Sequence, residues 1–167
     1  MSALKEALLV TGIDDVLTYI NSGNLIVKTN KTKSEVEDAI TKVLRGEFGL
    51  DSVTNKVLVL NESQLEEVLA KKPSGFGDQP DVYHTDIIFL IDLSVEEALG
   101  VFNPREGVDT IWPGPNVIYS QRLSAQRTKS RLNKIMGTPQ YKQMTIRTVT
   151  TVRKLAQLLS ELDVPTN

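Results

Sequence analysis

Hydrophobic and polar positions in the first half of the chain follow two different spacings. In some segments the apolar residues recur every three or four positions, as on one face of a helix, and in others they alternate or form short β-branched runs. The expected helices cover 2–11, 34–46 and 61–71, and the expected strands cover 14–20, 25–29 and 56–61. Asn-Ser-Gly-Asn at 21–24 separates the first two strands and is typical of a tight hairpin turn.

The second half of the chain repeats this order and adds one strand in front of it. The expected strands cover 85–92, 108–112, 116–121 and 143–147, and the expected helices cover 94–102, 130–137 and 148–162. The order strand, helix, strand, strand, helix, strand is that of the split βαβ, or ferredoxin-like, sandwich. We therefore predict an α+β protein of two tandem ferredoxin-like (α/β-plait) subdomains, the first of which lacks its opening strand.

A stretch rich in proline and glycine separates the two halves. The predicted subdomains are residues 1–72 and 84–167, joined by a linker at 73–83. An alternative is that two unrelated α+β segments have a similar order of elements by chance.

The opening strand of a ferredoxin-like unit is central in its sheet, so its absence would leave the neighbouring strands unpaired. One hypothesis is that Met1 is not the natural start and that an apolar strand once preceded Ser2. The other is that a partner supplies the strand.

Two expected helices carry the spacing of a capping box at their starts. Ser34 is followed three residues later by Glu37, and Ser94 is followed in the same way by Glu97. A serine hydroxyl and a glutamate carboxylate at this spacing satisfy each other's backbone N–H groups. We therefore expect the two helices to begin at these serines.

Two motifs resemble a known family. LTYINSGNLIV at 17–27 resembles the signature hairpin of the bacterial domain-of-unknown-function 1697 family, and MTIRTVTTVRKL at 144–155 is similar to that family's ending. The opening strand and glycine-rich turn of the family are absent, and Thr148 stands where the family usually has asparagine. The resemblance implies two ferredoxin-like subdomains and no activity, because the family is biochemically uncharacterised.

Composition excludes several kinds of chemistry. The chain of 167 residues has no cysteine, which excludes disulfides and thiol nucleophiles, and its one histidine, His84, makes a histidine-based zinc site or catalytic triad improbable. No apolar run approaches the ~18 residues that cross a bilayer. We expect a soluble cytoplasmic protein with no metal, no cofactor and no membrane contact. The sequence contains no recognisable set of catalytic residues, so it does not decide whether the protein is an enzyme.

The net charge of −2 conceals a strong polarisation along the chain. Residues 1–109 balance at −9, residues 110–160 hold nine basic residues and no acidic one, and the tail adds −2. The densest part, which we call the basic segment, is residues 122–134. A positive field of this kind favours anionic ligands.

The basic segment is the leading candidate for a binding site. We expect an anion at the start of the helix predicted over 130–137, where backbone N–H groups favour phosphate, with the hairpin tip orienting the ligand. The candidate binding residues are Tyr19, Ser22, Asn24, Arg122, Arg127, Lys129, Ser130, Arg131 and Arg147. Turn chemistry alone could explain the tip residues, and the cations could instead be solvated or pair with the acidic first half.

The predicted function is therefore binding of a small anionic ligand or nucleotide, and the alternative is a protein–protein interaction or structural module. Trp112 and Tyr119 could form a stacking platform for nucleic acid. That partner is weakly supported, because the aromatic and glycine pattern of RNA-binding sheets is absent.

Overall fold

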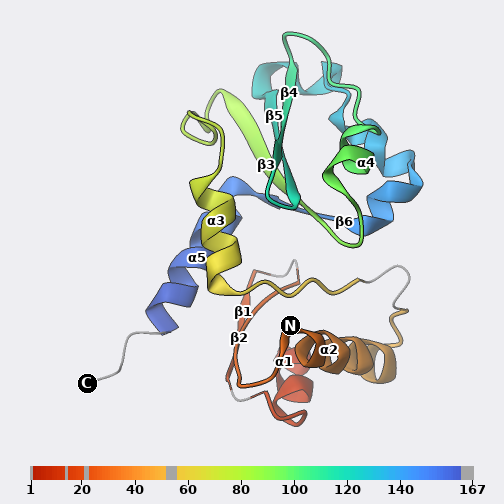
Figure 1. The fold of residues 1–167 in the computed structure, drawn as a ribbon, viewed down its shortest axis with the longest axis vertical. Coiled ribbons are helices and arrows are strands. Elements are labelled where there is room, and N and C mark those ends of the chain that lie inside the picture. Colours follow the sequence, from red (N-terminus) through yellow and green to blue (C-terminus); the bar gives the residue numbers. More distant parts are fainter. Residues whose placement is uncertain (1, 14, 21–22, 52–55, 163–167) are drawn as a thin grey trace. The chain divides into compact units, whose positions relative to one another are not determined.

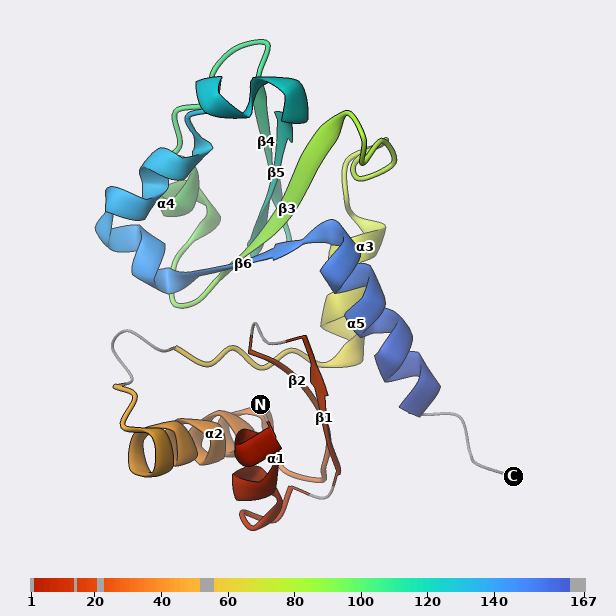
Figure 2. The same ribbon diagram turned by 180° about the vertical axis from the view of Figure 1, so that it is seen from behind.

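The computed structural model describes residues 2–13, 15–20, 23–51 and 56–162 (Figures 1 and 2). The chain forms two compact units, which we describe separately. The first unit comprises Met1–Glu62 with Gln157–Asn167, and the second comprises Ser63–Ala156. Both contain helices and an antiparallel sheet, so the predicted α+β class is confirmed. None of the helices in the described part of the chain has the length and hydropathy to cross a membrane.

The first unit is a hairpin packed against two helices. Its elements are α1 (Ser2–Leu9), β1 (Asp15–Tyr19), β2 (Asn24–Lys28) and α2 (Lys33–Phe48). β1 and β2 pair antiparallel, with Tyr19 opposite Asn24, as the turn composition predicts. The apolar faces of the two helices meet Val16 of β1 in a core that also contains Leu8, Ile13, Val36, Ile40 and Val43.

The capping box of α2 lies two residues before the predicted one. The Thr32 hydroxyl accepts the Glu35 N–H at 3.3 Å, and the Glu35 carboxylate accepts the Thr32 N–H at 2.7 Å. The expected cap at Ser34 is therefore wrong. The Glu37 carboxylate instead accepts the N–H of Val59 at 3.2 Å, so it is engaged outside the helix. At α4 (Val95–Leu99) the predicted box of Ser94 and Glu97 is confirmed.

This difference gives a stability prediction. Thr32→Ala is expected to lower the free energy of unfolding by about 1 kcal/mol, because an N-terminal amide of α2 loses its acceptor. Urea denaturation followed by circular dichroism measures the change. Ser34→Ala is the matched control and should be nearly neutral; a larger loss in Ser34→Ala than in Thr32→Ala would place the cap at Ser34.

The strand expected at 56–61 does not form. Residues 56–60 take part in no sheet of the described residues, although Val57 and Val59 pack against the first unit's core. The physical reason is the lack of a neighbouring strand, since an extended segment becomes a strand only by pairing its backbone groups with another.

The second unit has a four-stranded antiparallel sheet. The strands are β3 (Tyr83–Leu90), β4 (Asp109–Gly114), β5 (Val117–Leu123) and β6 (Met144–Thr148), in the order β4-β5-β3-β6. Strand β3 is therefore central, and its last four residues are buried. Figures 1 and 2 show α4 on one side of the sheet and α3 (Glu62–Ala70) on the other.

Three short 3-10 helices replace the single helix expected at 130–137. They cover Ser124–Lys129, Leu132–Gly137 and Pro139–Gln143, and they lead into β6. Leu132 and Ile135 of the middle one are buried against the α4 side of the sheet. After β6 the chain continues directly into α5 (Val149–Leu162).

The predicted linker is an ordered part of the second unit. Phe76 is 1% exposed and packs edge-on against Trp112 and Tyr119. Arg153 of α5 donates to the Gly77 carbonyl at 3.1 Å and pairs with Asp78 at 3.2 Å. Because Tyr119 is fully buried and Trp112 half-buried in this cluster, they do not form the exposed stacking platform considered from the sequence.

Candidate functional site

Strand register gathers polar side chains at one end of the sheet face that carries α4. His84 of β3 lies opposite Arg122 of β5, which in turn lies opposite Asp109 of β4. Two residues further along β3, Asp86 lies between Ser120 of β5 and Thr148 of β6. Directly opposed residues of antiparallel strands share a face. These residues form two neighbouring polar rows, one of His84, Arg122 and Asp109, and one of Thr148, Asp86 and Ser120.

The rest of this face is apolar. The next row contains Ile88, Ile118 and Ile146, which pack with α4 and the middle 3-10 helix in the unit's main core. Side chains alternate between faces every second residue, so the change from apolar to polar occurs along the strands, at the end where β3 begins. The polar rows are therefore a continuation of the core-facing surface.

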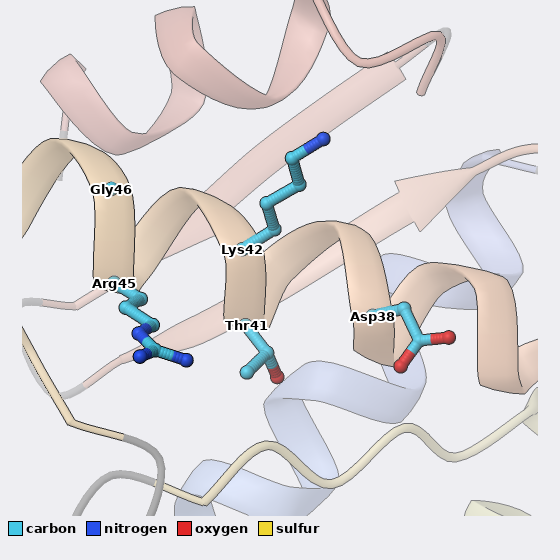
Figure 3. A pocket seen from close by; sticks show the side chains of 5 residues that line it. All are labelled: Asp38, Thr41, Lys42, Arg45 and Gly46. Carbon is cyan, nitrogen blue, oxygen red and sulfur yellow. The ribbon is translucent and has the colours of Figure 1, made fainter.

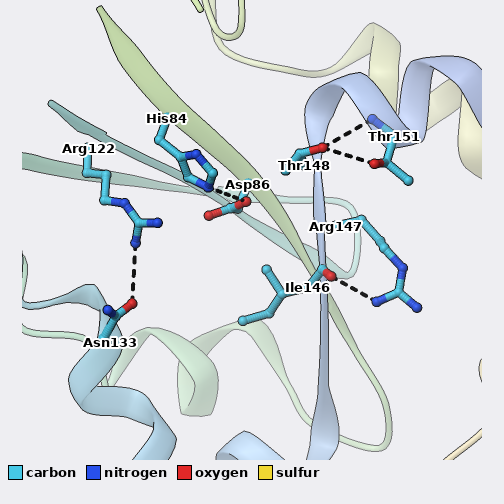
Figure 4. Close-up of polar contacts among 8 residues, drawn as sticks. All are labelled: His84, Asp86, Arg122, Asn133, Ile146, Arg147, Thr148 and Thr151. Atoms are coloured by element: carbon cyan, nitrogen blue, oxygen red, sulfur yellow. Dashed lines mark hydrogen bonds and ion pairs between the residues drawn. The ribbon is translucent and has the colours of Figure 1, made fainter. Parts of the chain in front are cut away.

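Within the polar rows, two contacts orient the charged groups (Figure 4). His84 Nε2 lies 3.1 Å from Asp86 Oδ1, and Arg122 Nη1 donates to Asn133 Oδ1 at 3.3 Å. The Asp86 side chain is only 15% exposed, whereas the His84 side chain is 42% exposed. The polar rows therefore contain a carboxylate held largely out of water beside an accessible imidazole.

Asp109 ties the basic segment to this end of the sheet. Its Oδ2 accepts the backbone N–H of Arg131 at 2.8 Å and that of Arg105 at 3.0 Å. The residue is 7% exposed, and its Oδ1 is buried without a hydrogen-bond partner among the described residues. Ser130 contributes to the same turn, because its hydroxyl accepts the Leu132 N–H at 3.3 Å.

The cations of the basic segment are largely uncompensated within their unit. Arg127, Lys129 and Lys134 are exposed, and Arg131 is half-buried. In the described part of the second unit, no ion pair involves any cation of the segment. The 3-10 helix that follows Ser130 has only six residues, so it replaces the longer helix whose N-terminus was expected to bind an anion. An anion at the basic segment would therefore be bound by the cationic side chains.

Arg147 lies apart from the other predicted cations. It pairs in register with Ile87, which places it on the sheet face opposite Arg122, and Figure 4 shows it extending away from His84 and Asp86. Its guanidinium donates to Thr145 Oγ1 and to the Ile146 carbonyl. Burial lowers the pKa of Arg147 from its ordinary value. The structure does not bring Arg147 together with the basic segment.

The predicted hairpin-tip residues belong to the first unit. Tyr19 is half-buried, and Asn24 is buried as the first residue of β2, with its amide donating to the Tyr19 carbonyl at 3.3 Å. Ser22 lies outside the described residues. Asn24 therefore closes the hairpin, and the pocket expected between the tip and the basic segment stays a prediction.

A separate cavity of about 520 Å³ lies along α2 (Figure 3). Its lining residues are Asp38, Thr41, Lys42, Arg45 and Gly46. All of them except Thr41 are exposed, and both signs of charge are present. Such a surface has no preference for one charge of ligand, so it is a weaker candidate than the polar rows.

The contact between His84 and Asp86 is not among the features predicted from the sequence. Their His-x-Asp spacing at the start of an expected strand was the available signal, since residues two apart in a strand share a face. It did not reveal which residues of the other strands would lie beside them, because that depends on register.

Comparisons with known proteins bear on the fold and the family. A family model described as a protein of unknown function, DUF1697, matches residues 1–119, which confirms the resemblance carried by the hairpin motif. None of the curated proteins matches the chain. The solved structure of a conserved bacterial protein from Streptococcus pneumoniae is similar, with a TM-score of 0.80 and 22% identity over 95% of this chain and 88% of that one. At this identity the similarity shows the fold alone.

Proposed function

The chain belongs to the DUF1697 family of proteins of unknown function, so its function has to be inferred from its own residues. We propose that its second unit binds a small anionic ligand, a phosphorylated metabolite or a nucleotide, at the basic segment. The observation that carries the proposal is the set of five cations that no ion pair within the described second unit neutralises. Arginine and lysine side chains in this state attract phosphate and carboxylate groups.

The polar contacts of the segment support the same function. The segment begins within β5 at Arg122, and the bonds from Arg131 N–H to Asp109 and from Arg122 to Asn133 hold its other end against the sheet. Exposed cations on an anchored backbone lose less conformational entropy on binding than cations on a free loop. Arg127 and Lys129 lie between these anchors and are the strongest candidates for direct contact with the anion.

A thermal-shift experiment tests the proposal. Nucleotides, sugar phosphates and short oligonucleotides are added separately, and at least one should raise the melting temperature by an amount that falls with added salt. Arg127→Ala combined with Lys129→Ala is expected to abolish this shift, because the variant removes two of the unpaired cations.

The matched control removes the same charge elsewhere. Lys42→Ala combined with Arg45→Ala alters two exposed cations of α2 that line its cavity, and it should keep the shift. If the control variant loses the shift and the basic-segment variant keeps it, the site is on α2. If no compound shifts the melting temperature, the alternative of a protein–protein interaction or structural module is favoured.

We also propose that both units derive from one ferredoxin-like plan. The strand order of the second unit supports this, because β3 is both first along the chain and central in the sheet. The first unit has the later elements in the same sequence, with 56–60 in the position of the last strand. A counterpart of β3 would lie between β2, which already pairs with β1, and 56–60, and it would give 56–60 a strand to pair with.

A further inference from the structure

We propose that the two polar rows are the second half of the ligand site and that they recognise the hydroxyl groups of a sugar phosphate. The inference rests on the proposed function, because it assigns the phosphate of the same ligand to the basic segment. It adds the chemical class of the ligand and names Asp86 as the residue that distinguishes this class from a bare anion.

Asp86 has the properties of a hydroxyl acceptor. Its side chain is 15% exposed, and among the described residues its one hydrogen-bond partner is His84, at Oδ1. A carboxylate that is largely removed from water needs hydrogen-bond donors. Ser120, its cross-strand neighbour, is 3% exposed. A ligand hydroxyl donating to Asp86 Oδ2 would satisfy the carboxylate without adding charge.

The neighbouring row is also incompletely satisfied. Asp109 is 7% exposed and its Oδ1 has no hydrogen-bond partner in the described structure. Buried polar atoms in native proteins nearly always have a hydrogen-bond partner, so an atom without one is unusual. Asp109 Oδ1 is itself covered by protein atoms, so the carboxylate of the two rows that a ligand can reach is that of Asp86, which suits a hydroxyl group better than an apolar one.

The rows and the basic segment lie close enough for one small ligand. Arg122 belongs both to a polar row and to the basic segment. It is the diagonal neighbour of Asp86, because Asp86 lies opposite Ser120 and Arg122 is two residues further along the same strand. Diagonal neighbours on adjacent antiparallel strands are about 7–8 Å apart. Asp109 also contacts Arg131 directly through the 2.8 Å bond. A monosaccharide phosphate has its hydroxyls and its phosphate separated by a comparable span.

The charges make the site selective. A carboxylate beside the cations repels a ligand that is anionic throughout, such as inorganic phosphate or pyrophosphate, while it accepts hydroxyl donors. The His84 side chain, 42% exposed, lies in the neighbouring row and contacts the same carboxylate through Nε2. The site therefore favours ligands that carry an anionic group at one end and hydroxyl groups at the other.

The test compares ribose 5-phosphate with inorganic phosphate by calorimetric titration of the full chain. The wild-type protein should bind ribose 5-phosphate more tightly. Asp86→Asn is expected to weaken ribose 5-phosphate by about ten- to a hundredfold, the usual loss for a hydrogen bond to a charged group, and to leave phosphate unchanged or slightly tighter. Asp81→Asn, an exposed carboxylate of the same unit, is the control and should change neither.

The outcomes separate this inference from the proposed function. If Asp86→Asn leaves the ratio of the two affinities unchanged while the Arg127 and Lys129 double variant loses both ligands, the sugar-phosphate assignment is overturned and the anion site stands. If neither compound binds the wild-type protein, both fail. Amide chemical shifts in the wild-type protein keep the test independent of variant folding: ribose 5-phosphate should move Asp86 and Ser120, and phosphate should not. Equal shifts with both compounds would overturn the inference.

Discussion

Phe76→Ala is expected to lower the free energy of unfolding of the second unit by about 3–5 kcal/mol, the usual cost of truncating a buried aromatic residue. Phe76 is 1% exposed, and its ring lies 5.3 Å from the Tyr119 ring and 6.0 Å from the Trp112 ring, both in edge-to-face geometry. The variant leaves a cavity between the segment at 73–83 and the sheet, and it removes two aromatic contacts that add to the loss.

Urea denaturation followed by tryptophan fluorescence measures this effect, since Trp112 is the chain's one tryptophan and packs against Phe76. Phe48→Ala is the matched control, because Phe48 is 41% exposed at the end of α2, and it should cost much less. A flexible linker would make the two variants alike. Comparable small losses would therefore contradict the packing of 73–83 onto the second unit.

Raising the pH from 10 to 12 is expected to destabilise the second unit through Tyr119. The Tyr119 hydroxyl donates to the Val68 carbonyl at 2.6 Å from a fully buried position. Burial raises the pKa of Tyr119 to about 12, and the nearby charge of Glu67 acts in the same direction. The neutral phenol is therefore preferred in the folded protein.

The sign of the pH dependence follows from the two pKa values. In the unfolded chain Tyr119 ionises near pH 10, so its contribution is fully present below that pH and is lost as the pH rises through about 12. A difference of two pKa units corresponds to about 3 kcal/mol. Urea denaturation at intervals between pH 9 and pH 12 measures the loss.

Tyr119→Phe isolates this contribution from that of other titrating groups. The variant is expected to be less stable at pH 8 by about 1–3 kcal/mol, because the Val68 carbonyl loses its donor. Its stability should fall less steeply than that of the wild-type protein above pH 10. Parallel curves for the two proteins would show that the Tyr119 phenol does not carry the dependence.

Only part of the candidate site can be predicted from local sequence. The charge of the basic segment is a property of composition, and the structure leaves its cations unpaired within their unit. The residues beside it could not be predicted in the same way. His84 and Asp86 are near in sequence, but Ser120 and Thr148 reach them only through strand pairing.

The sequence by itself determined the elements whose causes are local. The hairpin at 17–27, the capping box of Ser94 and Glu97, and the strands of the second unit all follow from turn residues, short-range hydrogen bonds and apolar spacing. Each depends on residues a few positions apart, so the spacing of residue types is sufficient to predict it.

Only the tertiary structure decided the features that depend on distant partners. Residues 56–60 have strand composition but no strand, because no central strand lies beside them in the described first unit. Phe76 is buried because the sheet it covers is assembled from strands far along the chain. Arg122 and Arg147 are on opposite faces because a shift of one residue in register reverses a side chain. Pairing between distant segments sets these positions, and a linear pattern of residue types does not contain it.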